Sequence, residues 1–300
     1  MGRMNVKLIL HGGAPALLDV MEGLTQRNAR AIRTREAPAL SSLNVGAMRY
    51  VAQPTWFDAP SAWQDGIASA GTLAAWKAGE LRANYSDDSV RVAMVSGVPV
   101  VVSGFGDRVR VVDDPSQQYG RVATAVQPIV GDASGKVTEY LVLAIDDDGS
   151  AVVDIGNAIA RHNARQIKAR KLPSLYSSKI RYKPEGSPEQ WLDAQEIVLR
   201  GADDCEGLSA YRAGELLAAG EIQMDGRLHK VADAGVYVRK IEVPTELMGG
   251  SGSGRLFHAL TRMTTRDGKV GYDDPSARLG MPVPNYHARE LEQKRAAGRL

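Results

Sequence analysis

The only cysteine of the chain, Cys205, lies in a turn that opens a helix, and His258 and Asp274 follow it in the sequence. A lone cysteine is more often a small buried core residue, but the later histidine and aspartate favour a reactive site. The thiolate is the reactive form, a histidine must accept its proton, and a carboxylate must orient that histidine. The order therefore indicates cysteine acyl transfer, with Asp273 as the alternative orienting carboxylate.

The residues next to Cys205 act on its thiol in opposite directions. Asp204 is a favourable N-cap residue, which places Cys205 in the first helical turn, where the helix N-terminus stabilises a thiolate. The negative charges of Asp203, Asp204 and Glu206 oppose that effect. The sequence does not decide which effect is larger, so the resting ionisation state is open at this point.

Acyl transfer also requires hydrogen-bond donors for the oxyanion that forms on the substrate carbonyl. The backbone amide of Cys205 is one expected donor. The side chains of Trp191 and Gln195 are candidates for the second.

One helix sequence occurs twice along the chain. The segment 73–81 (LAAWKAGEL) matches 208–216 (LSAYRAGEL), and the offset between their residue numbers is 135 (208 minus 73). Upstream, 8–43 aligns with 143–178 at the same offset, with 11 identities in 36 positions and no gap. Beyond the helix, an Asp-Asp-Pro-Ser run occurs at 113–116 and again at 273–276, where the offset is 160 (273 minus 113). Such self-similarity indicates an internal duplication.

The first copy lacks two of the three side chains that the chemistry needs. Ala70 occupies the position that corresponds to Cys205, and no histidine lies between Ala70 and Asp113. The aspartate of the first run, Asp114, is retained. We therefore expect the first copy to be catalytically inactive by itself.

The composition limits the classes of protein to which the chain can belong. Its 300 residues are enough for two domains, and 37 basic against 35 acidic side chains give no reason to expect a nucleic-acid or membrane partner. One cysteine excludes an intrachain disulfide, and no Cys/His cluster has zinc spacing, so no metal and no cofactor are expected. The apolar run near the N-terminus, 6–10, is too short for a signal or membrane segment, which predicts a soluble cytoplasmic protein.

Hydrophobic periodicity and capping residues predict the elements that must position these side chains. We expect a strand and a helix to open each copy, a helix that carries Cys205, and three strands that carry His258 and lead to Asp274. In residue numbers, the predicted strands are 6–10, 140–145, 236–243, 256–264 and 269–272, and the predicted helices are 17–33, 152–170, 188–199 and 206–219. The helix 188–199 is expected to be shortened in the first copy, and 285–300 is expected to form a charged tail.

Several of these motifs carry a family resemblance. They are the stretch 179–182, the turn Asp204-Cys205-Glu206, the helix through Leu216, His258, and the run Asp-Pro-Ser at 274–276 with Leu-Gly-Met at 279–281. Together they resemble the transglutaminase-like branch of the papain-like cysteine fold, in particular versions encoded among bacteriophage virion genes. The resemblance covers about 179–281 well and 46–120 in part.

The resemblance implies an α+β fold of two tandem repeats, each with a helix bundle packed on an antiparallel sheet. It implies a degenerate repeat at 1–136, a repeat with Cys, His and Asp at 137–284, and the tail at 285–300. It assigns Cys205 as nucleophile, His258 as general base and acid, and Asp274 as the orienting carboxylate.

Two classes of function follow. The first is a cysteine-dependent enzyme that acts on amides of a protein or peptide substrate, either as a peptidase or amidase or as a transglutaminase. The second is a structural or interaction protein, a component of a virion that contacts other virion proteins and uses the duplicated fold for its surfaces. The intact Cys, His and Asp favour the first class, and the inactive copy favours the second.

Overall fold

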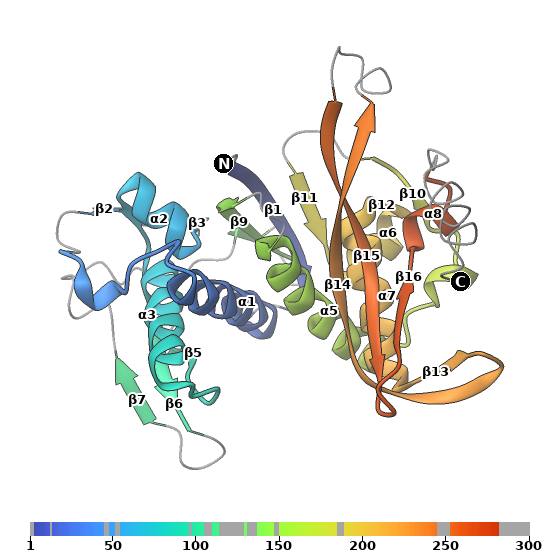
Figure 1. Ribbon diagram of the computed structural model, residues 1–300, viewed down its shortest axis with the longest axis horizontal. Helices are drawn as coiled ribbons and strands as arrows, with labels where there is room; N and C mark the ends of the chain where they lie inside the picture. Colours follow the sequence, from blue (N-terminus) through green and yellow to red (C-terminus); the bar gives the residue numbers. More distant parts are fainter. Residues whose placement is uncertain are drawn as a thin grey trace, which may run out of the picture.

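The computed structural model combines helices and strands in a mixed α and β architecture (Figure 1). It describes residues 3–12, 14–44, 48–51, 55–95, 98–104, 110–113, 129–130, 137–146, 150–184, 189–244 and 253–281. The predicted tail 285–300 and the retained Asp114 lie outside the described residues.

The first half of the chain forms two long helices and several shorter elements. In chain order these are β1 (Arg3–His11), α1 (Ala14–Arg33), η1 (Leu40–Ser42), β2 (Arg49–Tyr50), β3 (Thr55–Trp56), α2 (Ala59–Asp65), β4 (Ile67–Ala68), α3 (Ala70–Tyr85), β5 (Arg91–Val95), β6 (Val98–Ser103), β7 (Arg110–Asp113) and β8 (Ile129–Val130).

The second half runs through a similar series and ends in longer strands. Its elements are β9 (Val137–Asp146), α5 (Ser150–Arg170), η4 (Leu175–Ser177), β10 (Arg181–Tyr182), β11 (Glu189–Leu192), α6 (Ala194–Arg200), β12 (Ala202–Asp203), α7 (Cys205–Ala219), β13 (Glu221–Met224), β14 (Arg227–Pro244), β15 (Ser253–Thr265), β16 (Val270–Asp273) and α8 (Pro275–Arg278).

Several elements of the second half repeat elements of the first at the offset seen in the sequence. The pairs η1 and η4, α2 and α6, β4 and β12, and α3 and α7 all begin at positions related by that offset. The same hydrogen bonds recur with them. The side-chain oxygen of Asn28 accepts from the backbone N–H of Ala59 at 2.7 Å, and that of Asn163 accepts from Ala194 at 2.8 Å. The repeated sequence thus forms repeated local structure.

The helix predicted over 188–199 is wrong in its first part. Residues Glu189–Leu192 form strand β11, and Asp193 caps a shorter helix, α6. The strand pairs with β1, which buries Trp191 and Leu192 and satisfies the backbone by ladder hydrogen bonds, so a tertiary contact overrides the local helical pattern. The expected shortening in the first half is also wrong, because α2 and α6 are both seven residues long.

The two halves share one sheet, whose strand order is β11-β1-β9-β3, with β8 added beside β9. Strands β1 and β9 pair antiparallel at its centre, between the two lobes in Figure 1. Each of them then pairs in parallel with a strand of the opposite half, β1 with β11 and β9 with β3. Each half therefore supplies one strand, β3 or β11, that pairs with the long strand of the other half.

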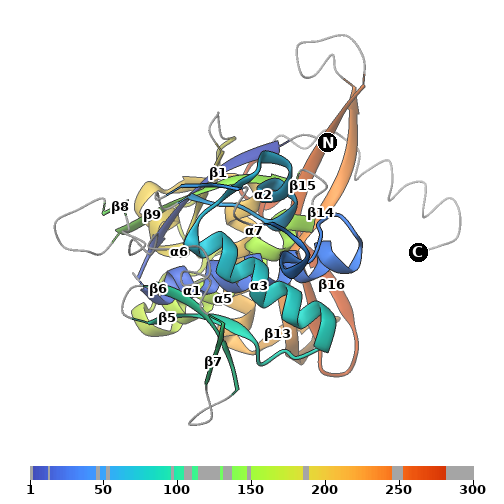
Figure 2. The ribbon, with the colours of Figure 1, turned by 90° about the vertical axis from the view of Figure 1, so that its left-hand side faces the viewer.

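Helices α1 and α5 pack against each other beside this sheet, as Figure 2 shows from the side of the first half. A side chain at Gly23 of α1 would place its Cβ 3.0 Å from the Cβ of Ala158 on α5, so any larger residue would require the two helices to move apart by a few tenths of an ångström. Reciprocal ion pairs flank the crossing. Arg30 of α1 binds Asp154 of α5 at 2.7 Å, and Arg165 of α5 binds Asp19 of α1.

A four-stranded antiparallel sheet, in the order β13-β14-β15-β16, is the platform for helix α7. Hydrogen bonds join the two directly: the Ser209 hydroxyl donates to the carbonyl of Ala259 at 3.0 Å, and the Thr261 hydroxyl donates to the carbonyl of Ser209 at 2.9 Å. This is the predicted arrangement of a helix on antiparallel strands. In the first half, α3 contacts the three-stranded sheet β5-β6-β7.

A buried polar cluster ties the end of β1 to the second half. Asp193 accepts hydrogen bonds from the backbone N–H of His11 and from the side-chain amide of Gln166, and its two carboxylate oxygens lie 3.1 Å from His11 Nδ1 and 3.2 Å from His162 Nε2. These hydrogen bonds outweigh burial and lower the pKa of Asp193. The matched pair of the first half is Arg27 and Asp58.

None of the helices in the described part of the chain is long and apolar enough to cross a membrane.

Replacement of Gly23 by leucine should push α1 and α5 apart. We expect a loss of about 1–3 kcal/mol in the free energy of unfolding, because overpacking a tight contact forces backbone shifts. Urea denaturation followed by circular dichroism measures this. Ala169→Leu, at an exposed position of α5, is the control and should change stability by less than about 0.5 kcal/mol. Equal effects of the two variants would contradict the close crossing.

Replacement of Asp193 by asparagine should cost about 3 kcal/mol of stability at pH 7, because the buried donors of His11, His162 and Gln166 lose the charged acceptor that they share. Since folding lowers the pKa of Asp193 from its usual 3.8, its stabilisation is present above that value and is lost as the pH falls below it. The acid-side slope of stability against pH should therefore be shallower in Asp193→Asn than in the wild type. Asp225→Asn, at an exposed turn, should leave the slope unchanged.

Candidate active site

Cys205 is the first residue of helix α7, as the sequence predicted, and its side chain is buried with 9% exposed. Asp204 is the N-cap residue, and its carboxylate accepts from the backbone N–H of Glu206 at 3.2 Å. The short strand β12 leads into this turn and pairs in parallel with β10, which fixes the start of the helix. Cys205 is therefore held at a helix N-terminus, where the first backbone N–H groups have no intrahelical partner.

His258 and Asp274 lie together. His258 Nε2 is 2.9 Å from Asp274 Oδ2, and the other carboxylate oxygen of Asp274 caps helix α8 by accepting from the backbone N–H of Ala277 at 3.0 Å. The histidine is 4% exposed. Its Nδ1 atom is buried and has no hydrogen-bond partner among the described residues. The carboxylate thus fixes one edge of the ring and leaves Nδ1 as the nitrogen that could accept a proton.

The residue after His258 brings strand β15 to the thiol. The backbone N–H of Ala259 is directed at the sulfur of Cys205, and this contact favours the thiolate. Strand β16 pairs with β15 only over Thr261–Thr264, so it does not extend to Ala259 and His258. The backbone of β15 at Ala259 therefore reaches the helix start beyond the end of β16, whereas the side chain of His258 points to the face of β15 opposite the one on which Thr261 contacts α7.

The thiol of Cys205 forms its hydrogen bond with Glu206, not with the histidine. Cys205 Sγ lies 2.9 Å from Glu206 Oε2. Burial, and after it the charges of Glu206 and Asp204, raises the pKa of the Cys205 thiol well above its usual value. The thiol of Cys205 is therefore protonated in the resting protein. The effects of burial and of the neighbouring acids on its pKa outweigh those of the helix N-terminus and of the Ala259 amide.

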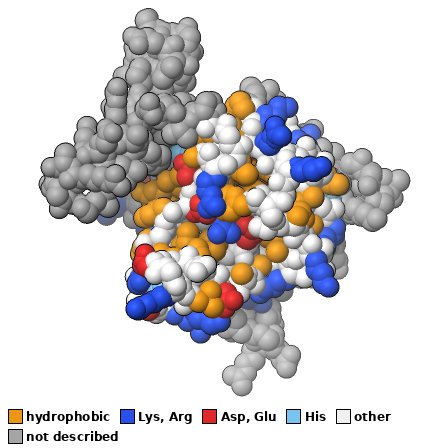
Figure 3. Space-filling view, turned by 90° about the vertical axis from the view of Figure 1, so that its right-hand side faces the viewer, with side chains coloured by type: hydrophobic (Ala, Val, Ile, Leu, Met, Phe, Trp, Pro, Cys, Tyr) orange, Lys and Arg blue, Asp and Glu red, His pale blue; other side chains and the backbone are white. Residues whose placement is uncertain are grey.

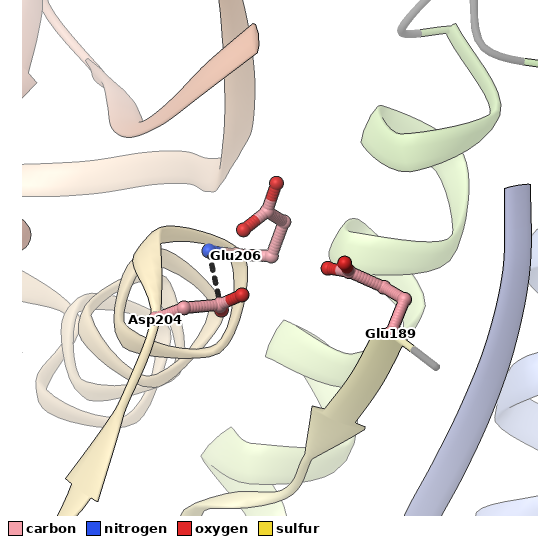
Figure 4. Close-up of side chains that lie close together, drawn as sticks. All are labelled: Glu189, Asp204 and Glu206. Atoms are coloured by element: carbon pink, nitrogen blue, oxygen red, sulfur yellow. Dashed lines mark hydrogen bonds between the residues drawn. The ribbon is translucent and has the colours of Figure 1, made fainter. Parts of the chain in front are cut away.

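Three carboxylates gather beside the thiol. One ligand oxygen each from Glu189, Asp204 and Glu206 lies within 4.8 Å of the other two, and Figure 4 shows Glu189 reaching across from β11 toward the start of α7. Oxygens this close could share one cation, and acidic groups also gather in this way without one. Their direct effect on Cys205 is electrostatic, because negative charge disfavours a second anion nearby.

Asp273, the alternative orienting residue, is engaged elsewhere. Its carboxylate accepts from the hydroxyl of Tyr176 at 2.7 Å and from Nε of Arg212 at 2.9 Å. The guanidinium of Arg278 stacks on the Tyr176 ring, 3.7 Å from its centroid. Asp273 therefore anchors the end of β16 to helix α7 and to η4, whereas the adjacent Asp274 meets the histidine.

The two side chains predicted as second oxyanion donors lie in different environments. The indole N–H of Trp191 donates to Glu189 at 3.0 Å, and the ring lines a narrow apolar hollow together with Glu206 and Gly207. Gln195, on α6, instead accepts a hydrogen bond from the exposed Arg170. Trp191 is thus placed beside the start of α7, and the side-chain carbonyl of Gln195 is occupied by an arginine.

Tyr182, on the short strand β10, packs against the core cluster that contains Cys205, and the sequence indicated no chemical role for it. Burial raises the pKa of Tyr182 to about 12, and the negative charges of Asp204 and Glu206 add to that increase. The hydroxyl is therefore protonated at neutral pH. Its place next to β12, which opens α7, is the signal that could have pointed to it.

The face of the sheet that carries His258 also carries exposed aromatic side chains. Tyr237 of β14 and Tyr272 of β16 contact each other edge to face, with ring centroids 5.2 Å apart. Directly opposed residues of antiparallel strands share a face, and the pairs Tyr237–Leu260 and Arg262–Tyr272 put both rings on the His258 side. Figure 3 shows the molecule from the side on which β16 and α8 lie in Figure 1, with hydrophobic side chains interspersed with Lys and Arg.

The hydrogen bond to Asp274 should fix the tautomer of His258. Because a carboxylate only accepts, we expect the neutral ring to carry its proton on Nε2 and to leave Nδ1 unprotonated. Long-range ¹H–¹⁵N correlation spectra of histidine-labelled protein distinguish the two tautomers. Asp274→Ala should change the nitrogen shifts of His258, whereas Asp273→Asn should leave them unchanged. A ring that carries its proton on Nδ1 in the wild type would refute the assignment.

The geometry brings a buried thiol to a helix N-terminus and places on the adjoining strand β15 a histidine that is paired with an aspartate following β16. Comparisons of the chain with protein-family models, with curated proteins and with solved structures find no match in any of the three.

Proposed function

We propose that the chain is a cysteine-dependent acyl-transfer enzyme that acts on amides. Cys205 is the nucleophile, His258 the general base and acid, and Asp274 the orienting carboxylate. The observation that carries the proposal is the hydrogen bond of 2.9 Å between His258 and Asp274, which leaves a buried Nδ1 without a described partner on the strand whose Ala259 amide contacts the thiol.

The chemistry follows from these positions. His258 Nδ1 takes the proton of the Cys205 thiol, the thiolate adds to the amide carbonyl, and the backbone N–H of Cys205 stabilises the oxyanion. The protonated His258 then gives its proton to the leaving amine as the carbon–nitrogen bond breaks, and a thioester forms. Asp274 stabilises the imidazolium throughout.

The thioester has two fates, which correspond to the two activities within this class. Attack by water, with His258 as base, releases an acid and makes the protein a peptidase or amidase. Attack by a primary amine forms a new amide and makes it a transglutaminase. In both cases the substrate that we propose is a protein or peptide.

We further propose that the fold is a tandem pair of transglutaminase-like repeats, the first of them degenerate. The recurrence of elements and of the Asn28 and Asn163 hydrogen bonds at one constant offset supports the duplication. Ala70 begins α3 where Cys205 begins α7, so the first half offers no nucleophile at the matched place.

A second candidate is a structural or interaction role, as a virion component that contacts other virion proteins. One observation favours it: in the described structure the thiol is hydrogen-bonded to Glu206 and its pKa is raised, whereas an activated cysteine nucleophile has a lowered pKa. In that case the surfaces of the duplicated fold would bind other virion proteins, and the thiol would have no catalytic role. Such a component would sediment with assembled particles, and its assembly would tolerate Cys205→Ala.

The test is an amide-turnover assay with the full chain. A digest of denatured protein is incubated with the enzyme, with and without a fluorescent primary amine, and mass spectrometry detects new cleavage, deamidation or amine incorporation. We expect turnover in the wild type, none in Cys205→Ala, and a loss of at least about a hundredfold in His258→Ala, because general acid–base catalysis typically contributes 10²–10⁴-fold.

Asp273→Asn is the matched control for Asp274→Asn. The two carboxylates are adjacent, but only Asp274 contacts His258, so Asp274→Asn should lower turnover far more than Asp273→Asn. Products that persist in Cys205→Ala would sink the enzymatic proposal, and failure of the wild type to modify any peptide or protein would favour the structural role.

A further inference from the structure

The thiol of Cys205 and the ring of His258 are not joined by a hydrogen bond in the described structure. The thiol donates to Glu206, at 2.9 Å, and the buried Nδ1 of His258 has no partner among the described residues. The thiol proton of Cys205 is therefore directed to the carboxylate of Glu206. The histidine nitrogen that is proposed to accept this proton has no described hydrogen-bond partner.

We propose that Glu206 masks Cys205: its carboxylate holds the thiol protonated, and it must move before the thiol can act as a nucleophile. This rests on the proposed function, since it concerns the same thiol. Glu206 is accordingly a masking residue of the resting protein.

Electrostatics and hydrogen bonding both support the mask. An acceptor that receives the S–H bond stabilises the protonated thiol, and its negative charge penalises the thiolate. Glu189 and Asp204 lie within 4.8 Å of Glu206 and add to the negative potential. Burial of Cys205, which is 9% exposed, keeps water from screening these charges.

The first half offers an internal comparison. At the constant offset between the halves, Gly71 corresponds to Glu206 and Trp56 corresponds to Trp191. A Cβ at Gly71 would lie 2.7 Å from the Trp56 ring, so no side chain fits there. In the second half Glu206 instead lines the apolar hollow beside Trp191. The carboxylate thus occurs in the half that has the thiol, and the half that lacks the thiol has no room for it.

Release of the mask is a proton rearrangement that needs no further reactant. When the Glu206 side chain turns away, the S–H group is free to donate to a base, which in the proposed mechanism is His258 Nδ1 once its ring has turned from the face of β15 opposite α7. The proton then passes from sulfur to nitrogen, leaving a thiolate and an imidazolium that Asp274 stabilises. No bond other than S–H is broken, and the net charge of the site is unchanged.

Alkylation of the full-length protein by limiting iodoacetamide tests the mask, because Cys205 is the only cysteine. The rate is measured from pH 5 to pH 9 in the wild type and in Glu206→Gln, which keeps the shape and removes the charge. We expect Glu206→Gln to react about tenfold faster or more at pH 7, since each unit by which a thiol pKa falls raises the thiolate fraction about tenfold. Glu206→Ala should behave likewise, and thermal melts confirm that each variant is folded.

Glu189→Gln is the matched control. It removes one charge of the same cluster but leaves the partner of the thiol in place, so its rate should stay within about threefold of the wild type. A gain in Glu189→Gln as large as in Glu206→Gln, or wild-type rates in both Glu206 variants, would overturn the mask.

Addition of His258→Ala separates the mask from the proposed function. If both hold, His258→Ala changes the wild-type rate little and removes most of the gain in the Glu206→Gln background. A gain in Glu206→Gln that survives loss of His258 supports the mask and counts against the catalytic role of the histidine. Sensitivity of the wild type to His258→Ala, with no effect of Glu206→Gln, overturns the mask and supports that role.

Discussion

The close crossing of helices α1 and α5 is the constraint on which both halves depend. Gly23 lets the backbone of α1 approach Ala158 and the carbonyl of Asp154, and the largest apolar cluster gathers side chains from both helices around this contact. The flanking ion pairs contribute less, because partly exposed pairs are typically worth about 0–1 kcal/mol, whereas burial of one large apolar side chain is worth about 1.5–3 kcal/mol. Burial raises the pKa of Asp154 to about 6 even though Arg30 lies 2.7 Å away. Apolar packing thus fixes the geometry of the crossing, and the ion pairs beside it contribute less to its stability.

The exchange of strands across the shared sheet links this crossing to the candidate site. Strand β1 of the first half pairs with β11, and β11 carries Glu189 and Trp191 to the start of α7. The first half, although it has no cysteine, therefore helps to shape the surroundings of Cys205. At the other end of β11, the cluster of Asp193 with His11 and His162 joins this strand to the end of β1 and to α5.

The same scaffold carries different chemistry in its two halves. Each half caps its short helix with an aspartate, but Asp58 pairs with an arginine, and Asp193 lies between two histidines. At the start of the long helix the contrast is sharper, because alanine and glycine of the first half are replaced by Cys205 and Glu206. A helix N-terminus favours a thiolate, yet a carboxylate one residue away opposes it, and burial makes the second effect dominant. The resting protein is thus built around a protonated thiol.

The sequence by itself determined the elements whose signals are local or repeated. The constant offset between the halves, the N-cap at Asp204, the helix that begins at Cys205, and the strands that carry His258 and lead to Asp274 follow from periodicity, capping and turn residues, and the structure has them. Only the tertiary structure decided that 189–192 is a strand, since its ladder partner β1 lies near the start of the chain, far away in sequence. It also decided that Asp274 meets the histidine while its neighbour Asp273 binds Tyr176 and Arg212, and that the thiol bonds to Glu206. Hydrogen-bond partners and burial depend on which distant segments pack together, and no local pattern encodes that choice.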